Sequence, residues 1–189
     1  MKRALALLLL AVLFFAVITG CSHTSKAPAS APAILSRRHG RIAPDFKFKD
    51  ASGKVSRLSD FRGKTIVLNF WASWCPMCKL ELPMLAALKQ EINSPNFEIL
   101  AVQLDNSTVL PKEIAALGDT VILAKDTFDQ AKNRYQISVL PVTYALDSEG
   151  RYIFFSDPKS HTLNISVSGP RQWNQEETLR ELRAAMEPR

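Results

Sequence analysis

The chain divides into three stretches by the pattern of its apolar and polar positions. Residues 4–18 form an uninterrupted apolar run of 15 residues, and residues 22–36 are mostly Ala, Pro, Ser and Thr. Beyond Gly40, short apolar runs alternate with segments that carry apolar residues at helical spacing. Such alternation of strand and helix signals predicts an α/β fold for the last stretch.

Local signals within the last stretch predict its individual elements. Runs rich in β-branched and aromatic residues favour strands, and runs rich in Leu, Ala, Lys and Glu favour helices. Asp126 is expected to cap one helix, and Asn174 with Glu177 three positions later suggests a capping box at another. Gly150 suits a hairpin turn over residues 148–150. The expected strands are 65–71, 97–104, 120–124, 142–147 and 151–155, and the expected helices are 76–91, 111–117, 126–135 and one that begins at Asn174.

The apolar run near the start has the features of an export signal. Lys2 and Arg3 precede it, and 15 residues is short for a membrane span but suits the core of a signal peptide. The run ends in Ile-Thr-Gly before Cys21, which resembles the bacterial lipobox, whose cysteine is lipidated and becomes the new N-terminus. An ordinary signal with a free cysteine, or an uncleaved anchor, are the alternatives.

The expected organisation is therefore a signal peptide at 1–20, a lipidated Cys21 with a flexible tether at 21–37, and a folded domain at 38–189. A tether of such composition cannot bury a core. With 189 residues and 47% hydrophobic content, the chain has room for one good core. The formal net charge of +6 is scattered, and basic residues are not interleaved with aromatic ones, so a nucleic-acid partner is not expected.

Two cysteines carry the clearest chemical signal. Cys75 and Cys78 lie two residues apart, where the expected strand 65–71 gives way to the expected helix 76–91. At a helix N-terminus the free backbone N–H groups favour a thiolate, and such sites lower a cysteine pKa from about 8.5 to roughly 3.5–7.5. A structural zinc site would need four protein ligands, and a purely structural disulfide over so short a loop would add little stability. The spacing predicts a redox-active dithiol.

The motifs around these cysteines resemble one known family. The stretches 40–46, 58–64, 69–78 and 140–147, the last followed by Gly150, are similar to the TlpA/ResA-type thioredoxin-like oxidoreductases among the AhpC/TSA-like redoxins. The resemblance covers about residues 38–188. It implies a thioredoxin fold: an α/β arrangement with a central mixed sheet flanked by helices, an N-terminal extension and a central β-α insertion between residues 103 and 127.

The resemblance also implies roles for particular residues. Cys75 would attack a partner disulfide, and Cys78, more buried, would resolve the mixed disulfide. Pro141 would be the cis-proline opposite the cysteines. The redox-active disulfide Cys75–Cys78 would be the only redox group, with no other cofactor and no metal. The residues expected to face the substrate are Trp74, Pro76, Met77 and Leu140.

Glu81 and several departures from the family pattern leave the tuning of the site open. Glu81 lies one helical turn after Cys78 and would be either an active-site carboxylate or a solvated surface residue. Asn69 stands where thioredoxin itself has a buried aspartate, and it cannot ionise. Trp71 and Trp74 could line the site or pack in the core. Val139 and Val142 replace the usual Gly and Thr around the proline, which predicts a more apolar substrate-facing edge.

The predicted function is an exported, lipid-anchored thiol-disulfide oxidoreductase facing the periplasm or the cell exterior. A protein-disulfide reductase is expected, recharged by a membrane electron transporter and acting on protein disulfides, as in cytochrome c maturation. A disulfide-forming oxidase would use the same residues. A copper-handling chaperone of thioredoxin fold is the alternative from another class, with His161 as the third ligand beside the two cysteines.

Overall fold

The structure is a computed structural model that describes residues 40–156, 163–169 and 171–187. In chain order its elements are β1 (Lys47–Asp50), β2 (Val55–Arg57), η2 (Leu58–Phe61), β3 (Thr65–Trp71), α3 (Pro76–Ile92), β4 (Phe97–Gln103), α4 (Lys112–Ala115), β5 (Ile122–Lys125), α5 (Gln130–Arg134), β6 (Val142–Leu146), β7 (Tyr152–Ile153), β8 (Phe155–Ser156), β9 (Leu163–Asn164), β10 (Val167–Ser168) and α6 (Glu176–Met186). Among the helices in these ranges, none has the length and apolar character needed to cross a membrane.

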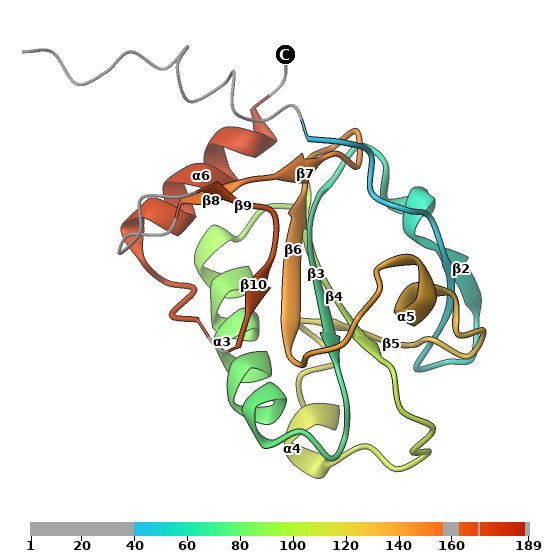
Figure 1. The fold of residues 1–189 in the computed structure, drawn as a ribbon. Coiled ribbons are helices and arrows are strands. Elements are labelled where there is room, and N and C mark those ends of the chain that lie inside the picture. Colours follow the sequence, from blue (N-terminus) through green and yellow to red (C-terminus); the bar gives the residue numbers. More distant parts are fainter. Residues whose placement is uncertain (1–39, 157–162, 170, 188–189) are drawn as a thin grey trace, which may run out of the picture. The chain divides into compact units, whose positions relative to one another are not determined.

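A mixed β-sheet with β3 near its centre organises the domain (Figure 1). The strand order is β10-β6-β3-β4-β5-β1-β2, and β7 pairs with β6. The neighbours β3, β4 and β5 run parallel, whereas β6 is antiparallel to β3 and β1 is antiparallel to β5. Every residue of β3 is buried, as expected for a central strand whose two faces are both covered.

Side chains of β3 alternate between two apolar cores. Leu68 and Phe70 belong to the core on one face of the sheet, and Val67 and Trp71 belong to the core on the other. Asn69 has the same parity as Val67 and Trp71, so the strand directs this buried amide to their face.

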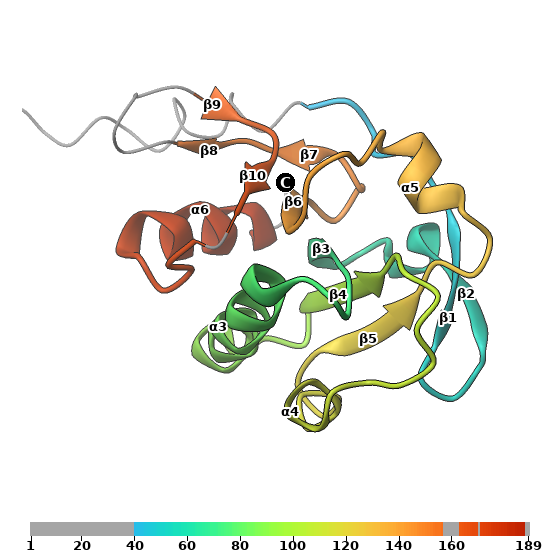
Figure 2. The same cartoon turned by 60° about the horizontal axis from the view of Figure 1, so that its bottom comes forward.

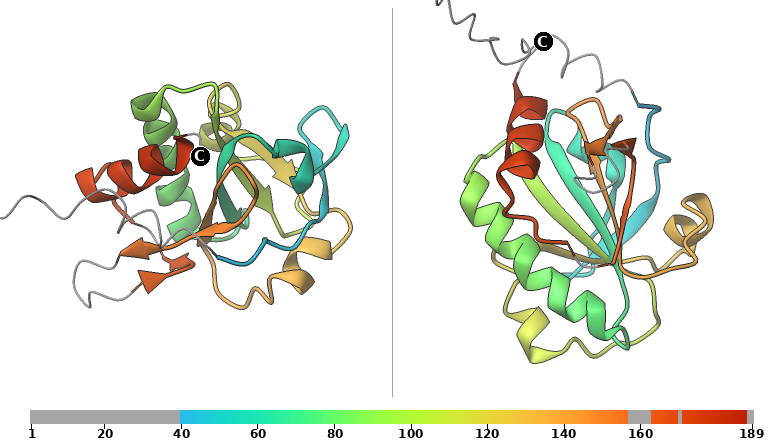
Figure 3. Two further views of the ribbon diagram at one scale, coloured as in Figure 1. Left: turned by 90° about the horizontal axis from the view of Figure 1, so that it is seen from above. Right: turned by 60° about the vertical axis from the view of Figure 1, so that its left-hand side comes forward.

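Helices cover both faces of the sheet. The helices α3 and α6 lie together on the face of Val67 and Trp71, and α5 lies on the opposite face, next to the N-terminal segment (Figures 1 and 3). Figure 2 shows the same separation from another direction, with α4 near the start of β5. The face under α3 and α6 is therefore where Asn69 and the start of α3 meet.

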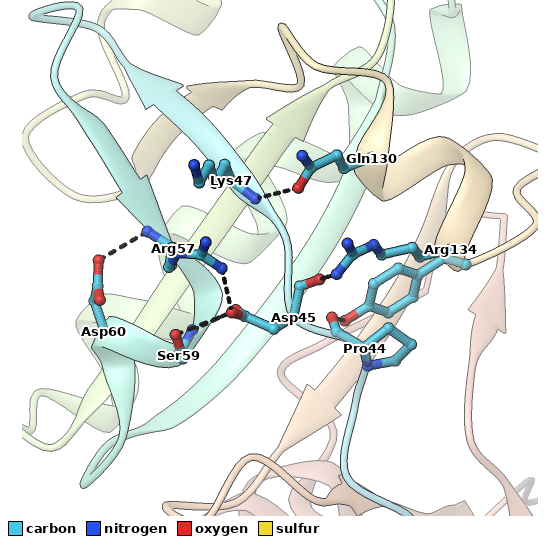
Figure 4. Close-up of polar contacts among 9 residues, drawn as sticks. Pro44, Asp45, Lys47, Arg57, Ser59, Asp60, Gln130 and Arg134 are labelled. Atoms are coloured by element: carbon cyan, nitrogen blue, oxygen red, sulfur yellow. Dashed lines mark hydrogen bonds and ion pairs between the residues drawn. The ribbon is translucent and has the colours of Figure 1, made fainter.

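Hydrogen bonds tie the N-terminal extension to α5 and to the residue that follows it (Figure 4). The Tyr135 hydroxyl donates to the Pro44 carbonyl at 2.9 Å, the Lys47 backbone N–H donates to Gln130 Oε1 at 3.1 Å, and Arg134 donates to the Asp45 carbonyl. Asp45 in turn accepts from the Ser59 backbone N–H at 2.9 Å and from Arg57 at 3.0 Å. Since the chain runs from α5 into residues 136–141, these bonds fix the start of the loop that carries Pro141.

This architecture confirms the predicted thioredoxin fold. A central mixed sheet flanked by helices is present, and β1, β2 and η2 form the N-terminal extension. The helix α4 and the strand β5 form the expected insertion between residues 103 and 127. The strand 65–71 is confirmed as β3, and the helix expected at 76–91 is α3, which extends one residue further to Ile92.

Two helices begin later than predicted. The helix α5 starts at Gln130 and its N-cap position is Asp129, not Asp126 as predicted. The Asp126 carboxylate nevertheless caps the helix start, because it accepts from the backbone N–H groups of Gln130, Ala131 and Lys132. The helix α6 starts at Glu176, and its N-cap makes no side-chain hydrogen bond, so the predicted capping box was wrong. Residues 173–174 form a turn in which Trp173 is buried, and the helix begins only after this turn.

Two other boundaries also differ from the prediction. The helix expected at 111–117 is shortened to Lys112–Ala115 and continues as turns up to Thr120. The strand expected at 151–155 is divided between β7 and β8, and β8 pairs with β9 instead of β6. Phe155 packs edge-on against Trp173 with ring centroids 5.6 Å apart, which draws this part of the chain toward α6.

Candidate active site

The two cysteines lie where β3 ends and α3 begins, as predicted. Cys75 is the N-cap residue of α3, and its Sγ accepts a hydrogen bond from the Cys78 backbone N–H at 3.2 Å. Pro76 occupies the first turn, where its missing N–H costs nothing. Cys75 and Cys78 form a disulfide, with their Cα atoms 5.3 Å apart. When this disulfide is reduced, the free N–H groups of the helix start favour a thiolate on Cys75.

The two cysteines are buried, whereas some of the side chains around them are exposed to solvent. Cys78 is fully buried and Cys75 is 4% exposed, in agreement with the prediction that Cys78 is the more buried thiol. Trp74 is 68% exposed and Met77 is 44% exposed. Trp71, in contrast, packs within the core. Of the two tryptophans, Trp74 is therefore the one on the surface beside the disulfide.

Pro141 lies at the end of β6 nearest the cysteines. The Leu140–Pro141 peptide bond is cis, as expected from the resemblance. Val142 pairs with Phe70, so Pro141 precedes β6 opposite the end of β3 that leads into the CxxC segment. Val139 is 59% exposed and Val142 is 7% exposed, so the exposed apolar contribution to this edge comes from Val139.

A recess of about 260 Å³ lies beside Trp74 and Leu140. Its lining residues are Ala72, Trp74, Leu104, Asp105, Lys132, Ile137, Ser138 and Leu140. Asp105 accepts from the Ser73 backbone N–H at 2.9 Å and from the Ser73 hydroxyl at 2.6 Å. Partial burial opposes ionisation of Asp105, but the bonds from Ser73 and others hold its pKa below the usual value. The recess thus combines apolar lining residues with the negative charge of Asp105.

Glu81 is fully buried, so it is not the solvated surface residue that the sequence left open. Its Oε1 accepts from the indole N–H of Trp173 at 2.9 Å, and its Oε2 accepts from Asn69 Nδ2 at 2.9 Å. The Thr143 hydroxyl also donates to Oε2, at 3.4 Å. Burial raises the pKa of Glu81 to about 7, although the hydrogen bonds from Trp173, Asn69 and Thr143 favour its ionised form. Glu81 can therefore exchange a proton near neutral pH.

The partners of Glu81 were not identified as site residues from the sequence. The sequence pattern marks Asn69 only as an amide at the position where thioredoxin has an aspartate, and it predicts no role for Thr143 or Trp173. The polar Asn69 within an otherwise apolar strand was a usable signal, because its parity directs it to the α3 face. Trp173 gave no such signal, since it lies 92 positions from Glu81 in the sequence.

Two residues of the sequence-based hypotheses lie outside the described part of the chain. Cys21, the predicted lipidation site, precedes residue 40, and His161 falls within 157–162. The copper-binding alternative depends on His161, so it stays a hypothesis. The polar contacts of Figure 4 lie around the N-terminal extension and α5, and none of the residues labelled there is a predicted site residue.

Known proteins similar to this chain include thiol-disulfide oxidoreductases. Residues 39–153 match the AhpC/TSA family. The chain is 34% identical over 151 residues to the thiol-disulfide oxidoreductase ResA of Geobacillus kaustophilus, and the match covers 79% of this chain and 82% of the relative. It is 32% identical over 154 residues to ResA of Oceanobacillus iheyensis, covering 79% of this chain and 76% of the relative. A thiol:disulfide interchange protein of the thioredoxin family from Chlorobium tepidum has the same fold, with a TM-score of 0.59, 21% identity, and coverage of 78% of this chain and 97% of that one.

Proposed function

Because this chain belongs to the AhpC/TSA family and is a thiol-disulfide oxidoreductase, we propose that it reduces protein disulfides outside the cytoplasm while a lipid anchor holds it at a bacterial membrane. The observation that carries the proposed chemistry is the position of Cys75 at the start of α3, where its Sγ accepts a backbone N–H. A thiolate held there is a nucleophile toward a partner disulfide.

The membrane location rests on the start of the sequence. Residues 1–20 would be removed as a signal peptide, Cys21 would be lipidated, and residues 21–37 would tether the domain 38–189. A tether of about 15 residues at about 3.1 Å each would let the domain stand up to ~45 Å from the bilayer. It would thus reach both a membrane electron transporter and exported proteins.

The catalytic cycle uses the cysteines in a fixed order. The Cys75 thiolate attacks one sulfur of the substrate disulfide, and the other substrate sulfur leaves as a thiolate. Cys78 then gives its proton to Glu81 and attacks Cys75 Sγ. This step forms the Cys75–Cys78 disulfide and releases the second substrate sulfur as a thiolate. The substrate is reduced by two electrons, and the electron transporter restores the dithiol by donating two electrons.

The substrate would bind around the exposed end of α3. Trp74 and Met77 are largely exposed next to Cys75, and Pro76 is exposed between the cysteines. Leu140 borders the recess beside Trp74 and precedes the cis-proline Pro141, whose backbone edge would align the substrate. This apolar surround favours extended, apolar segments flanking the substrate cysteine, which suits unfolded exported chains such as those handled in cytochrome c maturation.

A trapping experiment tests the order of attack and identifies the substrate. Replacing Cys78→Ser leaves Cys75 able to attack but removes the resolving thiol, so mixed disulfides with partners should accumulate. They would be isolated from the membrane fraction and identified by mass spectrometry. The matched control is Cys75→Ser, which should trap no partner. Trapping by the control variant alone would reverse the assigned roles.

The direction of electron flow needs a separate measurement. As a reductase, the protein should have a Cys75–Cys78 reduction potential below that of the pool around it, and the partners trapped by Cys78→Ser should accumulate disulfides in cells that lack the protein. A potential well above that of the pool would instead make it a disulfide-forming oxidase. The reduction potential of the Cys75–Cys78 disulfide is measured by equilibrating the protein with redox buffers of known potential.

A further inference from the structure

One buried oxygen behind the disulfide lacks a hydrogen-bond partner. Asn69 is fully buried, and within the described residues its Oδ1 accepts no hydrogen bond. Its Nδ2, in contrast, donates to Glu81 Oε2 at 2.9 Å and to Thr143 Oγ1 at 2.8 Å. A buried amide oxygen without a donor is costly, so this arrangement requires an explanation.

Apart from the Thr143 hydroxyl, which can donate or accept, the hydrogen-bond partners of Glu81 are donors and suit its ionised form. Trp173 Nε1 and Asn69 Nδ2 can only donate, and the backbone N–H of Arg171 is a further donor to the carboxylate. An ionised carboxylate accepts all of these bonds. A protonated carboxyl needs an acceptor for its O–H, and Asn69 in its present orientation turns a donor toward it.

We propose that the side-chain amide of Asn69 turns over when Glu81 takes up a proton, so that Asn69 Oδ1 replaces Nδ2 as the group facing Glu81. The turn is a rotation of about 180° around the Cβ–Cγ bond, which exchanges an acceptor for a donor without changing the shape of the side chain. The Thr143 hydroxyl, which accepts from Nδ2 in the present orientation, would then donate to Oδ1. In the present orientation the amide already leaves Oδ1 unpaired, so turning it over breaks no hydrogen bond of that oxygen.

This inference rests on the proposed role of Glu81 as the proton acceptor for Cys78. When Cys78 loses its proton to Glu81, the carboxyl becomes neutral and its O–H donates to Asn69 Oδ1. When Glu81 releases the proton, Nδ2 returns to support the carboxylate. Asn69 is therefore a positioning residue that stabilises both protonation states of Glu81, which an aspartate at the same position could not do without a proton of its own.

The groups that face Glu81 come from every element packed around it. The strand β3 contributes Asn69, β6 contributes Thr143, and the segment before α6 contributes Trp173 and the Arg171 backbone, while Cys78 precedes Glu81 by three residues on α3. The Arg171 guanidinium lies over the Trp173 ring, 5.8 Å from its centroid, and donates to Thr178. This guanidinium keeps its positive charge through the pH range in which Glu81 titrates. The competing arrangement keeps Asn69 still and uses Thr143 Oγ1 as the acceptor.

Nuclear magnetic resonance of the full-length oxidised protein in detergent micelles separates the two arrangements. The protein would carry ¹⁵N in the asparagine side chains and ¹³C in the glutamate carboxyls, with signals assigned from Asn69→Asp and Glu81→Gln variants. We expect the cross-peaks between the Asn69 amide protons and the Thr143 methyl group to weaken as the pH falls. Their midpoint should equal that of the Glu81 carboxyl carbon, which burial places near pH 7.

The Glu81→Gln variant is the matched control, because its side chain cannot titrate and its Asn69 signals should not change with pH. Cross-peaks that keep their intensity while the Glu81 carboxyl titrates would overturn the proposal and leave Thr143 as the acceptor. A Glu81 carboxyl that does not titrate between pH 4 and 9 would also overturn it. Trapping of partners by Cys78→Ser is measured separately. If the Asn69 amide does not turn but partners are trapped, this inference alone is refuted. If the amide turns but no partner is trapped, the reductase proposal alone is refuted.

Discussion

Glu81 combines the side chain of a surface helix residue with the environment of a core residue. It lies on α3, yet it is fully buried and bonded to Asn69, Thr143 and Trp173. Desolvation disfavours the carboxylate, and the hydrogen bonds to the ionised form only partly offset this effect, so the pKa rises to about 7. A raised pKa in the folded state makes stability depend on pH.

Replacing Glu81→Gln should remove that pH dependence. In the wild type, the unfolded chain ionises first, because its glutamate keeps the ordinary pKa of 4.5, so stability falls as the pH rises from about 4.5 to about 7. The loss relative to the variant should be on the order of 3 kcal/mol, from about 1.4 kcal/mol per unit of pKa shift. Urea unfolding of the oxidised proteins at a series of pH values measures it. Parallel curves for wild type and variant would contradict the prediction, and Glu91→Gln, an exposed change on the same helix, is the control.

At the scale of elements, the loop that carries Pro141 is held from both ends. On one side it continues directly into β6, which pairs with β3. On the other side it follows α5. Gln130 and Arg134 of this helix, and Tyr135 directly after it, are hydrogen-bonded to the N-terminal extension (Figure 4). The start of α5 depends in turn on Asp126, a buried carboxylate that accepts three backbone N–H groups.

Replacing Asp126→Ala should destabilise the fold by about 2 kcal/mol, because three helix N–H groups lose their acceptor. The free energy of unfolding in urea measures this loss. The comparison variant is Asp129→Asn, since Asp129 occupies the N-cap position of α5 but makes no side-chain capping bond, and its positive φ suits asparagine. That variant should remain within about 0.5 kcal/mol of the wild type. Equal losses in the two variants would show that Asp126 does not cap α5.

For the whole molecule, activity and location depend on separate parts of the chain. The described domain contains the dithiol, the cis-proline and the buried carboxylate, whereas the proposed anchor belongs to residues 1–37. A two-part arrangement of this kind predicts that the anchor can be removed without loss of dithiol chemistry.

Replacing Cys21→Ser should abolish lipid attachment and leave the dithiol chemistry unchanged. The variant should incorporate no radiolabelled fatty acid, while its purified form should reduce a model protein disulfide at the wild-type rate. Reduction of the membrane-dependent substrate in cells should fall, because the electron transporter and the domain are no longer held together. Fatty acid incorporation at the wild-type level would contradict lipidation at Cys21.

Short-range features were the most predictable from the sequence. The strand 65–71, the helix after it and the two cysteines at their junction were all predicted from neighbouring residues, and the hairpin turn at Gly150 followed from its positive φ requirement. The predicted element boundaries were wrong where residues distant in sequence pack together. The helix α6 begins only after the buried Trp173, and Phe155 packs against Trp173 instead of continuing β7. In both cases burial of an aromatic side chain stabilises the fold more than a longer helix or strand would.

The sequence by itself determined the dithiol and its setting, because a CxxC segment between a strand and a helix needs only near neighbours to acquire its chemistry. Only the tertiary structure decided whether Glu81 is a solvated surface residue or a buried carboxylate. Its partners lie 12, 62 and 92 positions away, and only the sheet and the segment before α6 bring them together around a buried carboxylate. Burial and hydrogen-bond geometry are properties of the folded chain, so the raised pKa of Glu81 could not be found in the order of the residues.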